Sequence, residues 1–127
     1  MTWEDAPDIK QEINKIVRVL ELENIKLNNI HCYRTEGSKA RAYARCWGFP
    51  KIFQRALNVE PAYVIEVLSS HFDRLSQDDR EKVLIHELLH IPKNFSGALL
   101  PHQTRERNLN RTANALFKEY KKRLKDI

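Results

Sequence analysis

Cysteine is scarce in this chain, which carries only Cys32 and Cys46 among its 127 residues. Small secreted domains with weak hydrophobic cores usually contain several disulfides, and cysteine zinc sites need closely spaced pairs. Neither pattern is present, so the sequence supports neither a disulfide framework nor a cysteine zinc site. We expect both cysteines to be small buried residues, and a single disulfide between them is the alternative.

Long apolar runs are also missing. The longest run is far shorter than the roughly 20 residues that a membrane-spanning helix needs. The acidic, proline-containing segment from Met1 to Asp8 lacks the basic and apolar regions of a signal peptide. We therefore expect a cytoplasmic protein without a membrane partner. Repeats, low-complexity tracts and linkers are absent as well, which predicts a single domain over residues 1–127.

The composition is typical of a soluble globular protein, with 42% apolar and 31% charged residues. The net charge of +5 is unevenly distributed: between Thr104 and Ile127, eight lysines or arginines face three carboxylates. A basic terminal helix can bind nucleic acid or an acidic partner. The alternative is a solvated helix face whose cations complement the helix dipole. No motif of a known nucleic-acid reader accompanies the charge.

The segment from Val83 to Ile91 carries the strongest functional signal. His86 and His90 are four residues apart, which on a helix puts both imidazoles on one face, about 6 Å apart at Cβ. Two imidazoles at this spacing can bind one zinc ion. Glu87 can reach a metal-bound water without binding the metal itself. The rest of the segment is aliphatic, so burying these three polar groups without a metal is unfavourable.

Catalytic zinc generally has three protein ligands and one open position. His102 is the best further candidate, because a loop containing proline and glycine can return it to the helix after His90. Glu106 is the second candidate and would complete a site of two histidines and one carboxylate. His31 and His71 lie in or near predicted strands, where a structural or exposed histidine is more common. The alternative for His102 is a surface histidine in a polar loop.

The hydrophobic pattern predicts an α+β fold with about three strands in a small antiparallel or mixed sheet. A first helix is expected from Pro7 to about Leu27. Residues 30–35 and 40–47 are predicted to form a hairpin. Residues 62–68 are predicted to form a third strand, and the position of Glu66 on it indicates a sheet edge to which an extended peptide could add.

Helix signals flank the histidine segment on both sides. Ser76 and Asp79 have the form of a capping box, which predicts a helix start near residue 77, and Pro92 predicts its end near residue 91. Thr104 is the expected cap of the last helix. The apolar stripe of that helix is Leu109, Ala113, Leu116, Phe117, Tyr120 and Leu124.

The string from His86 through Gly97 to Pro101 and His102 resembles the phage- and archaeal-type metallopeptidases, which are zincins. Residues 47–51 and 63–68 match the same family. The resemblance implies a compact zincin with His86, His90 and His102 on zinc and Glu87 as the catalytic acid and base. The layout is also similar to SprT-like proteases, which act on proteins attached to DNA, although this chain has no zinc ribbon.

The sequence thus predicts a zinc-dependent metallopeptidase that hydrolyses a peptide or protein substrate by a zinc-activated water, with Glu87 as general base. Arg105, Tyr43 and His71 are candidate donors to the oxyanion. Two alternatives remain. One is an inactive or DNA-associated zinc-binding module that uses the basic C-terminal helix. The other is hydrolysis of a non-peptide amide.

Overall fold

A four-stranded sheet forms the base of the molecule. The computed structural model describes residues 1–103 and 107–127. Its strands are β1 (Thr2–Asp5), β2 (Ile30–Glu36), β3 (Ala44–Trp47) and β4 (Tyr63–Leu68). They lie in the order β1-β2-β4-β3, with β2 and β4 parallel and the other neighbours antiparallel. The predicted α+β fold is confirmed, and β1 is a strand that the sequence did not predict.

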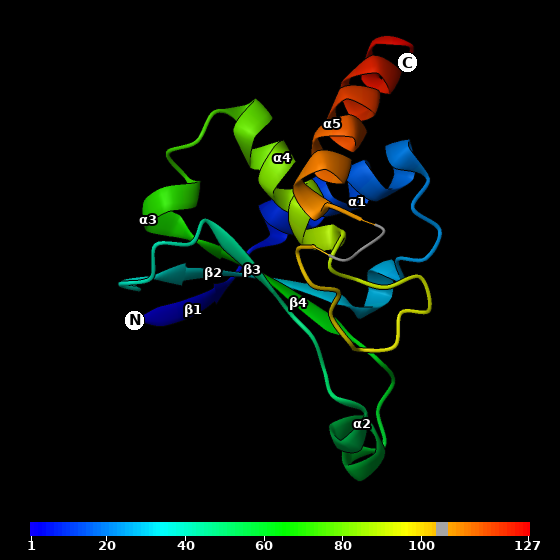
Figure 1. The fold of residues 1–127 in the computed structure, drawn as a ribbon. Helices are drawn as coiled ribbons and strands as arrows, with labels where there is room; N and C mark the ends of the chain where they lie inside the picture. The colour runs from blue at the N-terminus through cyan, green and yellow to red at the C-terminus, as the bar shows by residue number, and fades with distance from the viewer. Residues whose placement is uncertain (104–106) are drawn as a thin grey trace.

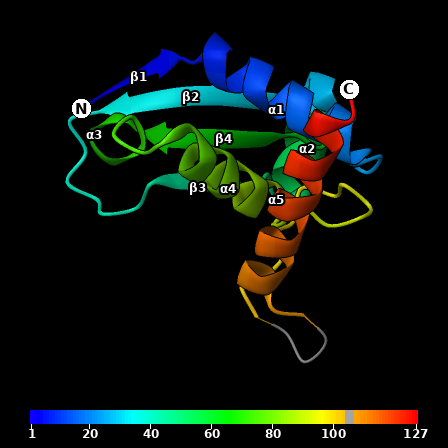
Figure 2. The same cartoon turned by 90° about the horizontal axis from the view of Figure 1, so that it is seen from above.

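Three helices, α1 (Pro7–Leu20), α4 (Gln77–Leu88) and α5 (Leu109–Lys125), form a layer on one face of this sheet (Figures 1 and 2). Two shorter helices, α2 (Lys51–Leu57) and α3 (Ser69–Phe72), follow β3 and β4, and a 3-10 turn (Leu27–Asn29) precedes β2. In the described parts of the chain, no helix combines the length and hydropathy that a bilayer crossing requires.

The core lies between the sheet and the helical layer. α1 begins with a proline in its first turn and buries the predicted stripe, which consists of Ile9, Ile13, Ile16, Val17 and Leu20. It ends at Leu20 instead of near Leu27. The reason is that Glu21 adopts a left-handed conformation with φ 54° while the amide of Leu22 donates back to the carbonyl of Val17. This is a Schellman ending, which stops the helix.

α5 packs through the predicted stripe. Leu109, Ala113 and Tyr120 are buried, and the other three members of the stripe are partly buried against the core. The N-cap is Asn108, whose side chain accepts a hydrogen bond from the Arg111 amide at 3.1 Å. Thr104, the cap expected from the sequence, lies outside the described residues.

The predicted hairpin between residues 30–35 and 40–47 is wrong. β2 pairs with β1 and β4, and among the described residues β3 pairs with β4 alone, over residues 44–47. The connection between β2 and β3 is long enough to cross over the position of β4. β4 therefore takes the centre, where Tyr63, Ile65 and Val67 are almost completely buried under the helices.

β4 is consequently a central strand, and the predicted edge position of Glu66 is wrong as well. Glu66 faces the side of the sheet opposite the helical layer, yet only 5% of it is exposed. It accepts hydrogen bonds from Thr35, from the Trp47 indole at 2.8 Å and from the Trp3 indole at 3.2 Å. These donors explain how a charged residue is accommodated at the sheet centre. The free sheet edge beside α4 belongs to β3.

Candidate metal centre

α4 begins where the sequence predicts. Ser76 is the N-cap, and its hydroxyl accepts a hydrogen bond from the Asp79 amide at 3.1 Å. The helix ends at Leu88, three residues earlier than expected, and the chain continues in a tight turn in which the His90 amide donates to the Glu87 carbonyl. Such i to i+3 bonds tighten the last turn ahead of Pro92, which has no amide hydrogen to continue a helix. His86 therefore lies on the helix and His90 in the turn that follows it.

His86, His90 and His102 converge. One ring nitrogen from each lies within 4.8 Å of the others, and the ring centroids are 4.6 to 5.2 Å apart. His31 and His71 are not part of this cluster. His31 is exposed on β2, and the ring of His71 packs edge-on against that of Tyr43, with 6.4 Å between the ring centroids. Glu106 and Arg105 lie outside the described residues. The donor set of three imidazole nitrogens fits zinc, which binds histidine nitrogen readily.

His90 is oriented by the loop that carries His102. Its Nδ1 lies 2.6 Å from the Leu100 carbonyl oxygen, and the Leu100 amide donates to the His90 carbonyl at 2.7 Å. A carbonyl oxygen only accepts, so Nδ1 carries the hydrogen and Nε2 keeps its lone pair. Histidine ligands of metals are usually held in this way by a second hydrogen bond.

The loop itself is anchored to β4, to α2 and to the segment just before α2. The Tyr63 hydroxyl accepts from the Gly97 amide at 2.8 Å and donates to the Ala98 carbonyl at 2.7 Å. The side-chain amide of Gln54 donates to the Ser96 carbonyl at 2.8 Å. Gly97 has φ +96°, and a Cβ there would overlap the Phe49 carbonyl, so only glycine fits. These contacts fix the path of the loop that carries His102.

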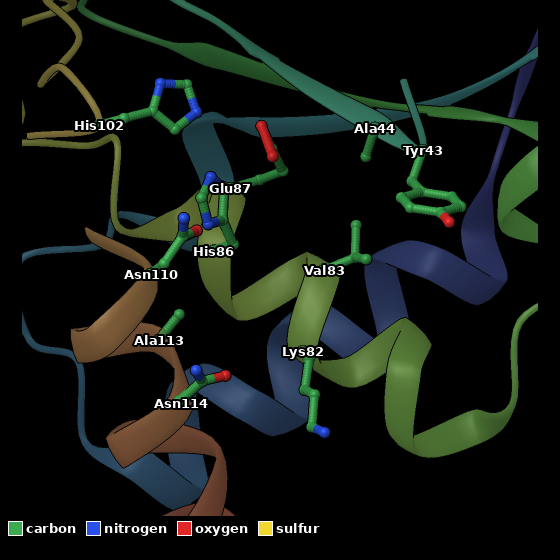
Figure 3. Close-up of a pocket in the computed structure, with 10 residues that line it drawn as sticks. All are labelled: Tyr43, Ala44, Lys82, Val83, His86, Glu87, His102, Asn110, Ala113 and Asn114. Atoms are coloured by element: carbon green, nitrogen blue, oxygen red, sulfur yellow. The ribbon is translucent and has the colours of Figure 1, made fainter. Parts of the chain in front are cut away.

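Glu87 lies beside the cluster and is buried. Only 7% of the residue is exposed. Burial raises the pKa of its carboxyl to about 7, although the Cys46 amide on β3 donates to it and lowers that pKa in part. Figure 3 shows His86 and Glu87 on α4, Asn110 on α5 and His102 on the intervening loop around one space. A carboxyl with a pKa near neutrality is suited to exchange protons.

His86 and His90 are held neutral. Burial, together with the neighbouring His90 and His102, lowers the pKa of His86 to about 4, although a hydrogen bond to Asn110 opposes this shift. Burial also lowers the pKa of His90. Neutral imidazoles are the form that binds a metal.

Two cavities meet at this site. One, of about 410 Å³, is lined by residues of α4 and α5 together with His102 and Tyr43. The other, of about 630 Å³, runs between the β3 edge and the loop and includes Cys46 and Glu87. Tyr43 lines the first cavity, whereas His71 lines neither of the two. Asn110 was not predicted, since no spacing signal singles it out.

Both cysteines are free thiols, and the possible disulfide is not formed. Cys32 is buried, as expected, whereas Cys46 is only partly buried because it borders the second cavity. Burial raises the pKa of the Cys46 thiol to about 12 and that of Cys32 to about 11, so neither is a thiolate ligand at neutral pH.

A family model described as "Putative phage metallopeptidase" matches residues 1–124 of this chain. No curated protein and no solved structure matches it. The match covers the sheet, the histidine cluster and nearly all of α5. The chain therefore belongs to this family of phage-type metallopeptidases, whose description implies a metal and the hydrolysis of peptides or proteins.

Proposed function

We propose that the protein is a zinc-dependent metallopeptidase in which His86, His90 and His102 hold zinc and Glu87 is the general base. The observation that carries this proposal is the convergence of three ligand nitrogens within 4.8 Å beside a buried carboxylate. Among the residues that the structure describes, the cluster contains three ligand side chains, which leaves a tetrahedral ion one open position. An open position is typical of catalytic zinc and not of structural zinc.

When bound, zinc supplies Lewis acidity, which polarises a carbonyl oxygen and lowers the pKa of a coordinated water from about 15.7 to about 7. Glu87 accepts the proton of the attacking water and delivers it to the amide nitrogen as the peptide bond breaks. Its burial keeps the carboxylate close to the reacting atoms and excludes bulk water. Of the oxyanion donors expected from the sequence, Tyr43 lines this cavity, and we assign the role to it on that ground.

The free edge of β3 is a binding site for an extended peptide. The sequence placed this role on residues 62–68, but β4 is paired on both sides, whereas β3 has no strand partner except β4 within residues 1–103 and 107–127. The Cys46 amide points from this edge toward Glu87. A substrate strand added to β3 would therefore lie along the second cavity, with its backbone beside Glu87 and the histidines.

The test is hydrolysis of an unfolded protein by zinc-loaded wild type, Glu87→Gln and His86→Ala. Glu87→Gln should retain zinc and lose about 100- to 10,000-fold in turnover, the usual contribution of a general base. His86→Ala should lose zinc and hydrolysis together. Glu23→Gln, at an exposed carboxylate, is the matched control. Unchanged turnover in Glu87→Gln would contradict the catalytic assignment.

A second candidate function, nucleic-acid binding, is favoured by one observation on α5. Arg111, Lys118, Lys122 and Lys125 are exposed at helical spacing on a single face. By contrast, Lys121 is paired with Asp78 and Glu81 at 2.8 and 2.7 Å. Replacing Lys118, Lys122 and Lys125 by Gln tests this candidate. Salt-dependent binding to duplex DNA that weakens in the variant would support it, and equal binding would refute it.

A further inference from the structure

α2 exposes large apolar side chains, although a short helix needs packing to be stable. The helix comprises residues 51–57, and none of them is buried. Ile52, Phe53 and Leu57 are 69%, 52% and 63% exposed. Isolated helices much shorter than about 12 residues are marginal in water, and most helices in proteins are stabilised by burying an apolar face. The exposed face of α2 is therefore suited to cover a partner.

The apolar side chains of α2 gather on the face that points away from the protein. At 100° per residue, Ile52, Ala56, Phe53 and Leu57 span an arc of about 140°. Gln54 lies outside this arc and holds the helix to the rest of the molecule through its bonds to the Phe49 and Ser96 carbonyls at 2.7 and 2.8 Å. α2 accordingly projects from the end of the sheet (Figure 1).

α2 is rigidly coupled to the loop that carries His102. The Phe49 amide donates to the Gly97 carbonyl at 2.8 Å. Gly48 and Gly97 approach so closely that a Cβ on either would overlap the backbone of the other segment. Together with Gln54, these contacts hold the apolar face of α2 at a fixed position relative to the cluster of histidines.

The β3 edge leads from the catalytic carboxylate to α2. Cys46 and Trp47 line the second cavity together with Glu87, and residues 48–50 then connect β3 to α2. A peptide added along β3 and extended beyond Trp47 would reach the apolar face of α2. Every charged residue from Gly37 to Val59 is a cation, namely Lys39, Arg41, Arg45, Lys51 and Arg55. The surface along this path therefore complements carboxylates.

We propose that α2 is an exosite that binds protein substrates through an apolar segment flanked by aspartate or glutamate, away from the scissile bond. This inference rests on the proposed peptidase function. Its occupant is a substrate chain because α2 is tied to the His102 loop and lies at the end of the β3 edge. Docking to a membrane or to a second copy of the chain would require neither feature.

The experiment measures binding in the Glu87→Gln background, so that it does not depend on hydrolysis. A fluorescent unstructured peptide of about 20 residues carries a Leu-Phe-Leu segment flanked by Asp and Glu, and a control peptide has Ser in place of those apolar residues. Replacing Ile52, Phe53 and Leu57 by Ser should raise the Kd for the first peptide about tenfold or more. Ile127→Ser, at an 89% exposed apolar residue outside this path, is the matched control and should leave the Kd unchanged.

A second variant tests the charge component without removing apolar surface. The double variant Lys51→Glu, Arg55→Glu should bind the acidic peptide more weakly than wild type does. It should bind a peptide flanked by Lys and Arg more tightly. An unchanged Kd in both variants would overturn the exosite. It would also be overturned if the Ser variant lost binding to phosphatidylglycerol vesicles while still binding peptide, or if it only converted a wild-type dimer to a monomer. Peptide binding through α2 without cleavage by wild type would instead refute the proposed peptidase function and leave α2 as a peptide-binding surface.

Discussion

Two hydrogen bonds join His90 to the Leu100 backbone: the imidazole Nδ1 donates to the Leu100 carbonyl at 2.6 Å, and the Leu100 amide donates to the backbone carbonyl of His90 at 2.7 Å. The end of α4 and the loop that carries His102 therefore move as a unit. His90 and His102, which we propose as metal ligands, are therefore held close together by the backbone itself.

The first prediction concerns the tautomer of His90. Because the Leu100 carbonyl accepts from Nδ1, metal-free His90 should be protonated on Nδ1 and carry its lone pair on Nε2. Nitrogen-15 NMR measures this directly, with His90→Gln to assign the signals and His31, exposed on β2, as an internal reference. Addition of zinc should shift the Nε2 signal of His90. A hydrogen on Nε2 in the metal-free protein would contradict the hydrogen bond from Nδ1 to the Leu100 carbonyl.

The second prediction concerns Gly97. A Cβ at this position would have an unfavourable φ of +96° and would also overlap the Phe49 carbonyl. We expect Gly97→Ala to lower the free energy of unfolding by about 3 kcal/mol or more, since backbone strain and overpacking act together. Gly37→Ala is the control. Gly37 also has a positive φ of +78°, but a Cβ there would meet its nearest neighbours at 3.4 Å, which is ordinary contact. Gly37→Ala should therefore lower the free energy of unfolding by only about 1 to 2 kcal/mol. Equal losses in urea unfolding would contradict a tight contact at Gly97.

The third prediction concerns the buried carboxylate of Glu66. Burial raises the pKa of Glu66, but hydrogen bonds from Thr35, Trp47 and Trp3 outweigh it and hold that pKa below the usual 4.5. Glu66→Gln places an amide NH₂ among these donors and should lower the free energy of unfolding by about 1–3 kcal/mol at pH 7.

The pH dependence of this loss follows from the lowered pKa. The stabilisation is complete above the unfolded pKa and disappears as the pH falls through the still lower folded pKa. The difference in free energy of unfolding between wild type and Glu66→Gln should therefore be constant above about pH 4.5 and shrink in stronger acid. Urea unfolding at pH 7, 4.5 and 3, with exposed Glu36→Gln as control, measures it. A difference that grows in acid would contradict this account.

The local signals in the sequence predicted the elements that position the candidate site. The capping box at Ser76, the aliphatic run and Pro92 located α4 to within a few residues, because caps and prolines act on the backbone beside them. The apolar stripes of α1 and α5 are likewise confirmed, since the packing of a helix face is encoded by residues close in sequence.

Pairing between strands was less predictable, because it depends on residues far apart in the chain. β1 carries four exposed residues and shows no apolar alternation, so nothing in its sequence indicated a strand. The pattern of Glu66 indicated an edge, whereas its donors come from β1, β2 and β3. The hydrogen bond between Asn110 and His86 likewise depends on how α5 crosses α4.

The most direct test of the account is the zinc content and affinity of purified wild type, His102→Ala and His31→Ala. Wild type and His31→Ala should bind one zinc ion per chain with equal affinity. Removing a group that only hydrogen-bonds to a metal ligand already weakens metal binding about 10- to 100-fold, so the zinc affinity of His102→Ala should fall by more than about 100-fold. Full zinc content and unchanged affinity in His102→Ala, measured by elemental analysis and chelator competition, would contradict the proposed three-histidine site.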